Sequence, residues 1–373
     1  MGKILSKGRE RERERERERQ GSSSRRQYQT GSEDDTGLSV DDAQVMPAVH
    51  SDAINWVSCV GPHHVLTCSD DRSFALHRSE KEQLALRGRF LGHTRAVNCA
   101  DACAMDGVAV SCSRDRSIKM WRLSSFSSSS ASSHVDVEDA ERTIDDAHDL
   151  TISSVCMHSS GTQFCSGSRD TAVSLWDVES GKSLLTRKTP RNLVTCLGWI
   201  GGKTIAQGSE DLRVRVWDMS AHGAPAMTLQ GYTYFPLCMD VSSDGNYILT
   251  GSKGFNGVGC ELRLWDVRTG KQLQEMTGHM QDTTGVAFVP APVGSSSSSL
   301  CAVSVSKDQT VRLWDVSEGR QLAEEHVPDG SPCSAVACSM DQRLVYASTA
   351  MGHLSIFRIR DDGQALKLCG KTG

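Results

Sequence analysis

The chain has 373 residues, of which 38% are hydrophobic and 5% aromatic, and it carries a formal charge of −5. No apolar run approaches the roughly 18 residues that cross a bilayer, and no signal-peptide pattern follows the start. The chain is therefore expected to be soluble or attached peripherally to a membrane. Residues 1–26 carry ten Lys and Arg against five Glu, which leaves −10 for the remainder. A body this acidic argues against a nucleic-acid partner.

Fourteen cysteines are scattered along the chain without a C-x-x-C pair. Because no secretory signal is present, we expect free, buried thiols rather than a set of disulfides. The Cys and His residues also lack the spacing of a zinc site, so the sequence predicts no metal and no cofactor.

The first 42 residues are predicted to form a disordered tail. Met1 to Ser6 fit the pattern M-G-x-x-x-[ST], which predicts N-myristoylation at Gly2; the alternative is an unmodified terminus. One acyl chain binds membranes only weakly, so stable attachment to a membrane surface needs a second signal. The alternating Arg and Glu of residues 9–19 fit a lipid-facing segment or a solvated spacer equally well.

From about residue 43 one pattern recurs: a Ser-rich stretch with an Asp, then an alternating segment that ends in Trp-Asp. Seven equivalent positions close these segments at intervals of 41 to 55 residues: His77, Trp121, Trp176, Trp217, Trp265, Trp314 and Phe357. The longer intervals contain visible insertions, at residues 124–133, 136–149, 254–259 and 293–299. A period of about 40–45 residues with Gly-His near its start and Trp-Asp near its end is typical of a propeller blade.

Residues 43–369 therefore resemble the WD40 β-propeller family. The resemblance implies an all-β fold in which seven blades, each a sheet of four short antiparallel strands, close into a ring. Residues 370–373 would then be a C-terminal tail. Either Gln44–Val49 or Ala365–Cys369 can supply the outer strand of the last blade, and we favour the first.

In that family a His, a Ser or Thr, the turn Asp and the Trp form a hydrogen-bonded tetrad that satisfies a buried carboxylate. The resemblance places tetrad residues in four blades: His93, Asp115 and Trp121; His148, Asp170 and Trp176; Asp211 and Trp217; His279, Asp308 and Trp314. The hydroxyl is either of two serines in three of these blades: Ser111 or Ser113, Ser166 or Ser168, Ser304 or Ser306. The fourth blade is expected to start near Pro190.

The same Ser, His and Asp could be mistaken for a catalytic triad. However, the set recurs at the repeat period, whereas a catalytic group is normally needed once. The sequence also lacks a G-x-S-x-G elbow, a P-loop and a dinucleotide-binding G-x-G-x-x-G. It predicts no enzymatic activity and no small-molecule substrate.

Departures from the repeat indicate where a partner could bind. The blade that ends in Trp265 has Tyr232 in place of His and a Gly-rich loop, residues 254–259, in place of the tight Asp turn. In this fold the loops between second and third strands share one face with the links between blades. We therefore expect a protein-binding site on that face; the alternative is a merely tolerated loop. The candidate residues are Phe255, Arg114, Arg169, Glu210 and Lys307.

Three segments are further similar to one subfamily of WD-repeat proteins: the start Met1-Gly2-Lys3, residues 191–195 and residues 254–261. That resemblance implies a role in ciliary protein trafficking with small-GTPase regulators, although the Arg-Glu run and the poly-Ser insertions depart from the subfamily. The predicted protein is a cytoplasmic, non-catalytic interaction scaffold that is tethered to membrane through acylated Gly2 or located in the cilium. The alternative is a soluble structural subunit of a larger complex without a lipid anchor.

Overall fold

The structure is a computed structural model that describes residues 44–80, 82–103, 107–123, 134–221, 223–290, 300–339, 343–360 and 363–372. The chain divides into two compact units, Met1–Leu38 and Ser39–Gly373, and every described residue belongs to the second. The predicted acylation site Gly2, the Arg-Glu run and the Ser-rich insertions at 124–133 and 293–299 lie outside the described residues.

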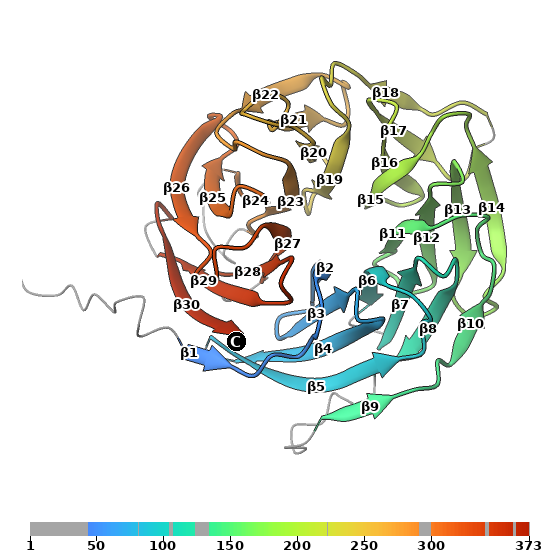
Figure 1. The fold of residues 1–373 in the computed structure, drawn as a ribbon. Helices are drawn as coiled ribbons and strands as arrows, with labels where there is room; N and C mark the ends of the chain where they lie inside the picture. Colours follow the sequence, from blue (N-terminus) through green and yellow to red (C-terminus); the bar gives the residue numbers. More distant parts are fainter. Residues whose placement is uncertain are drawn as a thin grey trace, which may run out of the picture. The chain divides into compact units, whose positions relative to one another are not determined.

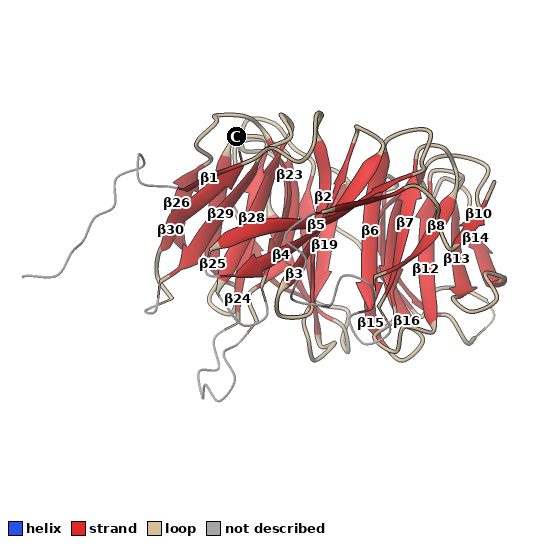
Figure 2. Ribbon diagram, turned by 90° about the horizontal axis from the view of Figure 1, so that it is seen from below, coloured by secondary structure: helices blue, strands red, loops and turns tan. Residues whose placement is uncertain are grey.

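Seven sheets of four or five strands stand around a central axis in the second unit (Figure 1). In each blade the first strand is innermost, and the strands run between two faces that carry the loops (Figure 2). The fold is the expected all-β seven-bladed propeller.

The first three blades contain these strands. Blade one has β2 (Ile54–Val60), β3 (His64–Ser69), β4 (Ser73–Glu80), β5 (Gln83–Leu91) and an added β9 (Val135–Val137); blade two has β6 (Val97–Cys103), β7 (Val108–Ser113), β8 (Ile118–Arg122) and β10 (Arg142–Ile144); blade three has β11 (Ile152–Met157), β12 (Gln163–Ser168), β13 (Ala172–Asp177) and β14 (Ser183–Lys188).

The other four blades follow in chain order. Blade four has β15 (Val194–Gly201), β16 (Thr204–Ser209), β17 (Arg213–Asp218) and β18 (Met227–Leu229); blade five has β19 (Pro236–Val241), β20 (Tyr247–Ser252), β21 (Leu262–Asp266) and β22 (Gln272–Met276); blade six has β23 (Thr283–Phe288), β24 (Cys301–Ser306), β25 (Thr310–Asp315) and β26 (Arg320–His326); blade seven has β27 (Cys333–Cys338), β28 (Leu344–Thr349), β29 (Leu354–Ile359), β30 (Leu366–Thr372) and an added β1 (Gln44–Met46).

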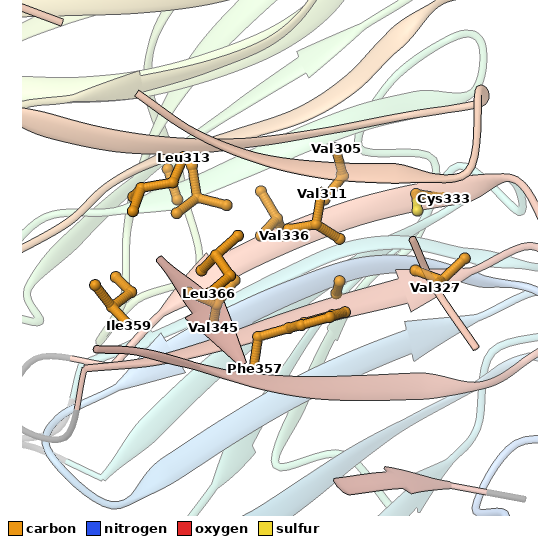
Figure 3. Packing of buried hydrophobic residues seen from close by; sticks show 13 residues of the cluster. Val305, Val311, Leu313, Val327, Cys333, Val336, Val345, Phe357, Ile359 and Leu366 are labelled. Atoms are coloured by element: carbon orange, nitrogen blue, oxygen red, sulfur yellow. The ribbon is translucent and has the colours of Figure 1, made fainter. Parts of the chain in front are cut away.

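The hydrophobic core is divided among the interfaces between blades. Each of seven buried clusters combines residues of two neighbouring blades, including the pair formed by blades seven and one. Figure 3 shows the cluster in which Val311 and Leu313 of blade six approach Val345, Phe357 and Leu366 of blade seven. A single blade is too thin to bury its own apolar faces, so each sheet depends on both neighbours for stability.

Hydrogen bonds near the axis also join the blades. The second residue of an inner strand donates from its side chain to the carbonyl of the first residue of the next inner strand. Six junctions use this bond: Asn55 to Val97 (3.1 Å), Asn98 to Ile152 (2.6 Å), Ser153 to Val194 (2.6 Å), Thr195 to Pro236 (2.7 Å), Thr284 to Cys333 (2.9 Å) and Ser334 to Ile54. At the remaining junction Leu237 has no donor, and the neighbouring Cys238 thiol contacts the Thr283 carbonyl at 3.4 Å instead.

Ring closure differs from the arrangement that the sequence favoured. The fourth strand of blade seven is the C-terminal β30, antiparallel to β29, whereas the N-terminal β1 pairs parallel to the outside of β30. Only six residues separate β29 from β30, and the Arg360 N–H donates to the Ala365 carbonyl. A local hairpin costs less loop-closure entropy than a pairing between chain ends, which favours β30 in this position.

Two predicted boundaries also change. β30 continues to Thr372, so residues 370–372 are part of the sheet rather than a tail. The acidic stretch 136–149 was interpreted as an insertion, but it contributes β10 as the outer strand of blade two. Most of β9 also lies in this stretch and pairs parallel to β5 of blade one.

Candidate functional site

Three blades contain a hydrogen-bonded chain of four side chains. His Nδ1 lies 2.9–3.0 Å from an Asp oxygen and His Nε2 lies 2.7–2.8 Å from a Ser hydroxyl, which also accepts from Trp Nε1 at 2.7–2.9 Å. The members are His93, Ser111, Asp115 and Trp121 in blade two; His148, Ser166, Asp170 and Trp176 in blade three; and His279, Ser304, Asp308 and Trp314 in blade six.

The geometry determines one consistent set of donors. The indole N–H donates only, so the hydroxyl that accepts it donates in turn to His Nε2, and Nδ1–H donates to the carboxylate. The second serine of each blade has another role: Ser113 Oγ accepts from the Asp115 N–H at 3.0 Å and donates to the Arg95 carbonyl at 3.1 Å. Every polar group of these three tetrads therefore has a hydrogen-bond partner within its blade.

These contacts keep the turn aspartates ionised. Burial alone would raise the pKa of Asp170, but hydrogen bonds from His148 and from backbone N–H groups outweigh it and lower the pKa to about 2. The same balance, with His50, His93 and His279 as donors, holds the pKa of Asp71, Asp115 and Asp308 well below the usual range. Each carboxylate therefore acts as a charged acceptor that fixes its blade, and proton transfer has no part in this role.

Blade one contains a tetrad that the sequence reasoning missed. His50 Nδ1 lies 2.9 Å from Asp71, its Nε2 lies 2.8 Å from Thr67, and His77 Nε2 contacts the same Thr67 hydroxyl at 2.9 Å. Burial lowers the pKa of His77 to about 3, so its ring is neutral and donates as the Trp does elsewhere. The signal was present, because Ser69-Asp70-Asp71 has the same Ser-x-Asp spacing as Ser113-Arg114-Asp115.

Blade four uses a different set of residues. Trp217 donates to the Gln207 carbonyl oxygen at 2.8 Å, and the Gln207 amide donates to Asn192 at 2.5 Å. Asp211 was expected in a His-type tetrad, but it pairs with Arg215 at 2.5 Å, and Arg215 also donates to Asn192. Asn192 therefore takes the His position, two residues beyond the predicted start at Pro190.

Blades five and seven depart further. In blade five the Tyr232 hydroxyl lies 2.9 Å from the Thr250 hydroxyl, and the Arg263 guanidinium, 4.9 Å from the Tyr232 ring, forms a buried ion pair with Glu261 at 2.8 Å. In blade seven Thr349 donates to Asp329 at 3.0 Å, while Phe357 fills the Trp position without a polar atom. Neither sheet reproduces the His–Ser–Asp–Trp chain.

The tetrads are not arranged to process a substrate. Ser111, Ser166 and Ser304 are completely buried. Across the described ranges, no group of three or more His, Cys, Asp or Glu side chains is placed to hold a metal ion. The same part of the chain includes no helix long and apolar enough to span a membrane.

Comparisons with known sequences agree with this geometry. Residues 223–266 and 270–315 match the family model "WD domain, G-beta repeat", and residues 102–202 match "Anaphase-promoting complex subunit 4 WD40 domain". The chain is a propeller of WD40 repeats.

Several curated WD40 relatives share part of the propeller. Identity is 31% over 184 residues with the nuclear distribution protein PAC1 of Arthroderma otae, which covers 46% of this chain and 37% of the relative. It is 24% over 301 residues with nudF of Aspergillus niger (74% and 62%) and 25% over 286 residues with the ribosome biogenesis protein WDR12 homolog of Drosophila mojavensis (72% and 63%). The chain thus spans less than two thirds of the length of these relatives.

The predicted partner residues of the WD40 propeller lie on one face, which we call the upper face because it carries the turns between second and third strands and the links between blades. The residue after each second strand donates its N–H, at 2.9–3.0 Å, to the carbonyl of a residue in the link that enters its blade. These seven equivalent positions, the upper ring, are Asp70, Arg114, Arg169, Glu210, Lys253, Lys307 and Ala350.

Two ion pairs connect members of the upper ring across blade boundaries. Arg114 lies 3.4 Å from Asp70 and Arg169 lies 2.7 Å from Glu210. Lys307 pairs with Asp282, in the link between blades five and six, at 2.8 Å. The ring thus includes four of the five predicted partner residues. Its members Asp70 and Lys253 were not predicted, and neither was Asp282, the partner of Lys307. Phe255, the fifth, lies two residues after Lys253 with 68% of its surface exposed.

Proposed function

We propose that this WD40 propeller is a non-catalytic platform that binds other proteins through its upper face. The main support is the upper ring, in which six of seven equivalent turn positions carry a charge. The side chains of Arg114, Arg169 and Lys307 are each 50% exposed, although each has an ion-pair partner. Half-exposed pairs are worth about 0–1 kcal/mol, so a partner protein can replace them at little cost.

The test compares two charge-reversed variants of the full chain by proximity labelling in cells. Arg114→Glu with Arg169→Glu alters the upper ring, whereas the control, Lys182→Glu with Lys271→Glu, alters exposed residues in links on the opposite face. We expect the first variant to lose labelled partners that the control keeps. If both variants label the same proteins as the unmodified chain, the upper face is not the binding site.

The finer assignment rests on sequence resemblance. The Met1-Gly2-Lys3 start, residues 191–195 and residues 254–261 resemble WD repeat-containing protein 31, and on this basis we propose a role in ciliary trafficking with small-GTPase regulators. The relatives named for nuclear distribution and ribosome biogenesis suggest other assemblies in which a propeller of this kind serves as a scaffold. Labelling of ciliary proteins by the intact chain would support the first role, and labelling of preribosomal proteins instead would contradict it.

We further propose that myristoylated Gly2 tethers the platform to membranes; the alternative is a soluble subunit with an unmodified tail. The M-G-x-x-x-[ST] pattern supports the tether. Metabolic labelling with an alkynyl myristate analogue should mark the native chain and not Gly2→Ala. Equal absence of label from both chains would favour the soluble subunit.

A further inference from the structure

Four large apolar side chains are exposed together at blade five. Tyr234, Phe255, Val258 and Met280 have exposed fractions of 42%, 68%, 56% and 54%. They come from three upper-face segments: the link into β19, the loop between β20 and β21, and the link between β22 and β23. We call these four residues the blade-five patch.

The loop that carries Phe255 and Val258 has a defined conformation. The Phe255 N–H donates to the Val258 carbonyl at 3.0 Å, and the Val258 N–H donates to the Phe255 carbonyl at 3.1 Å. Asn256 and Gly257 lie between them with φ of 52° and 76°. An Asn-Gly pair with both residues in the left-handed region is the preferred type I′ turn of a two-residue hairpin, so the sequence itself specifies this shape.

Contacts on both sides hold the hairpin in place. The Gly257 N–H donates to the Met280 carbonyl at 3.1 Å, and the Gly254 N–H donates to the Asp282 carboxylate at 2.9 Å. On the other side the Tyr234 ring lies against Gly259, where an added Cβ would be only 2.1 Å from the ring. The patch is therefore contiguous and preorganised, although its side chains remain exposed to water.

The surroundings of the patch are charged but of mixed sign. Lys253 precedes the hairpin, is exposed, and holds its Nζ 5.1 Å from the centre of the Phe235 ring. Lys307 lies in the adjacent blade-six turn with Asp282 as its partner. Asp70 and Glu210 share the upper face. Because an anionic bilayer favours a uniformly basic rim, this mixture fits a protein segment better than a membrane surface.

We propose that the blade-five patch seats an aromatic or leucine side chain of a partner's peptide segment, and that an acidic residue of that segment pairs with Lys253. This assignment rests on the proposed function, and it adds the location and chemistry of the contact. Preorganised apolar anchors dominate protein interfaces, because little conformational entropy is lost when they are covered, and a charged contact at the rim selects the partner.

The experiment uses the full chain and a displayed library of random twelve-residue peptides. We expect enriched peptides to combine an aromatic or leucine with Asp or Glu. Fluorescence polarisation should then show at least tenfold weaker binding of an enriched peptide to Phe255→Ser with Val258→Ser. Leu184→Ser with Leu273→Ser, a control on exposed outer strands, should bind as the unmodified chain does. Lys253→Glu should weaken the acidic peptide and strengthen its Asp-to-Lys counterpart.

Several outcomes would overturn the proposal. In the first, the library yields no peptides that bind the unmodified chain better than Phe255→Ser with Val258→Ser. In the second, an enriched peptide binds this variant as tightly as the unmodified chain. In the third, Lys253→Glu leaves the affinity of the acidic peptide unchanged. Because all substituted side chains are exposed, an unchanged thermal midpoint will verify that each variant is folded. Sedimentation with phosphatidylserine/phosphatidylcholine vesicles that depends on Phe255 and Val258, but not on Gly2, would assign the patch to membrane instead.

Failure of this assignment is distinguishable from failure of the proposed function. If Arg114→Glu with Arg169→Glu removes cellular partners while Phe255→Ser with Val258→Ser keeps them, the upper face binds partners and the blade-five assignment is wrong. If neither variant changes the labelled proteins, both are wrong.

Discussion

The residue types at neighbouring positions of a tetrad depend on one another, because their side chains share a limited space. In blades two and six an added Cβ at Gly92 or Gly278 would lie 3.2 or 3.1 Å from the tip of the Trp121 or Trp314 ring. Blade one has Val49 at that position and the smaller His77 at the Trp position, and both line one small pocket. The valine thus occupies space that an indole fills elsewhere.

This exchange predicts strong coupling between residues 49 and 77. His77→Trp alone should destabilise the protein by about 1–3 kcal/mol, because the small pocket beside Val49 cannot hold an indole as well as the valine. Val49→Gly with His77→Trp should recover most of the loss. Urea unfolding of the two single variants and the double variant measures the interaction free energy. Additive effects would show that the two side chains do not share this space.

The buried carboxylates make stability depend on pH in two opposite ways. Asp170, with a folded pKa of about 2 against 3.8 unfolded, contributes stability that is present above pH 4 and lost as pH falls toward 2. Burial raises the pKa of Asp101 and Asp240 to about 6, although the Met157 and Phe288 N–H groups bond to them. Their contribution is complete below about pH 4 and is lost as pH rises through 6.

The urea midpoint should fall below about pH 4 as the turn aspartates are protonated. Between about pH 5 and about pH 8 two effects oppose each other. Asp101 and Asp240 lower the midpoint, whereas His77, whose folded pKa of about 3 lies below the usual value of 6.5, raises it. Asp101→Asn with Asp240→Asn removes the groups that titrate near pH 6, so its midpoint should rise more between about pH 5 and about pH 8 than that of the unmodified chain. The same change of midpoint in both chains over this range would contradict the assignment.

At the level of elements, the sequence repeat predicted some features of the fold and missed others. The Trp positions and the insertions at 254–259 could be found from the sequence, because the same residues return at a regular spacing. Asn192 and Gln207 could not, because they replace His and Ser with residues that do not recur. The position of β30 depends on a comparison of two strand pairings of similar length, which residue patterns do not resolve.

The closing strands predict unequal sensitivity to truncated side chains. Leu366 of β30 is buried in the cluster between blades six and seven, whereas Val45 of β1 is 63% exposed. Leu366→Ala should cost about 2–4 kcal/mol of unfolding free energy, and Val45→Ala should cost less than about 0.5 kcal/mol. Equal effects, measured by urea unfolding, would mean that β1 is as important to blade seven as β30.

At the level of the whole molecule, stability is shared among seven similar interfaces. Each has one apolar cluster and at least one hydrogen-bonded contact near the axis, and only the junction of blades seven and one joins residues from opposite ends of the propeller. Ser334 of blade seven makes that contact with the Ile54 carbonyl. This closing junction carries the highest loop-closure cost of the ring.

Ser334→Ala should therefore loosen the closing junction. The variant removes a donor to a carbonyl near the axis, which should cost about 1–2 kcal/mol. Hydrogen exchange of the full chain should accelerate in β2 and β27 before it does so in blades three and four. Uniform acceleration in all blades would show that the closing junction has no special weight.

The central claim is that the buried tetrads hold the fold and that the upper face provides binding. The most direct test measures thermal unfolding of two variants, Ser166→Ala and Arg114→Glu with Arg169→Glu, and proximity labelling of partners by the same variants in cells. Loss of the Ser166 hydroxyl leaves His148 and Trp176 without their partner, so its midpoint should fall by an amount equivalent to about 2–4 kcal/mol. The Arg114/Arg169 variant should keep its midpoint and lose partners. An unchanged midpoint with lost partners in Ser166→Ala would contradict the account.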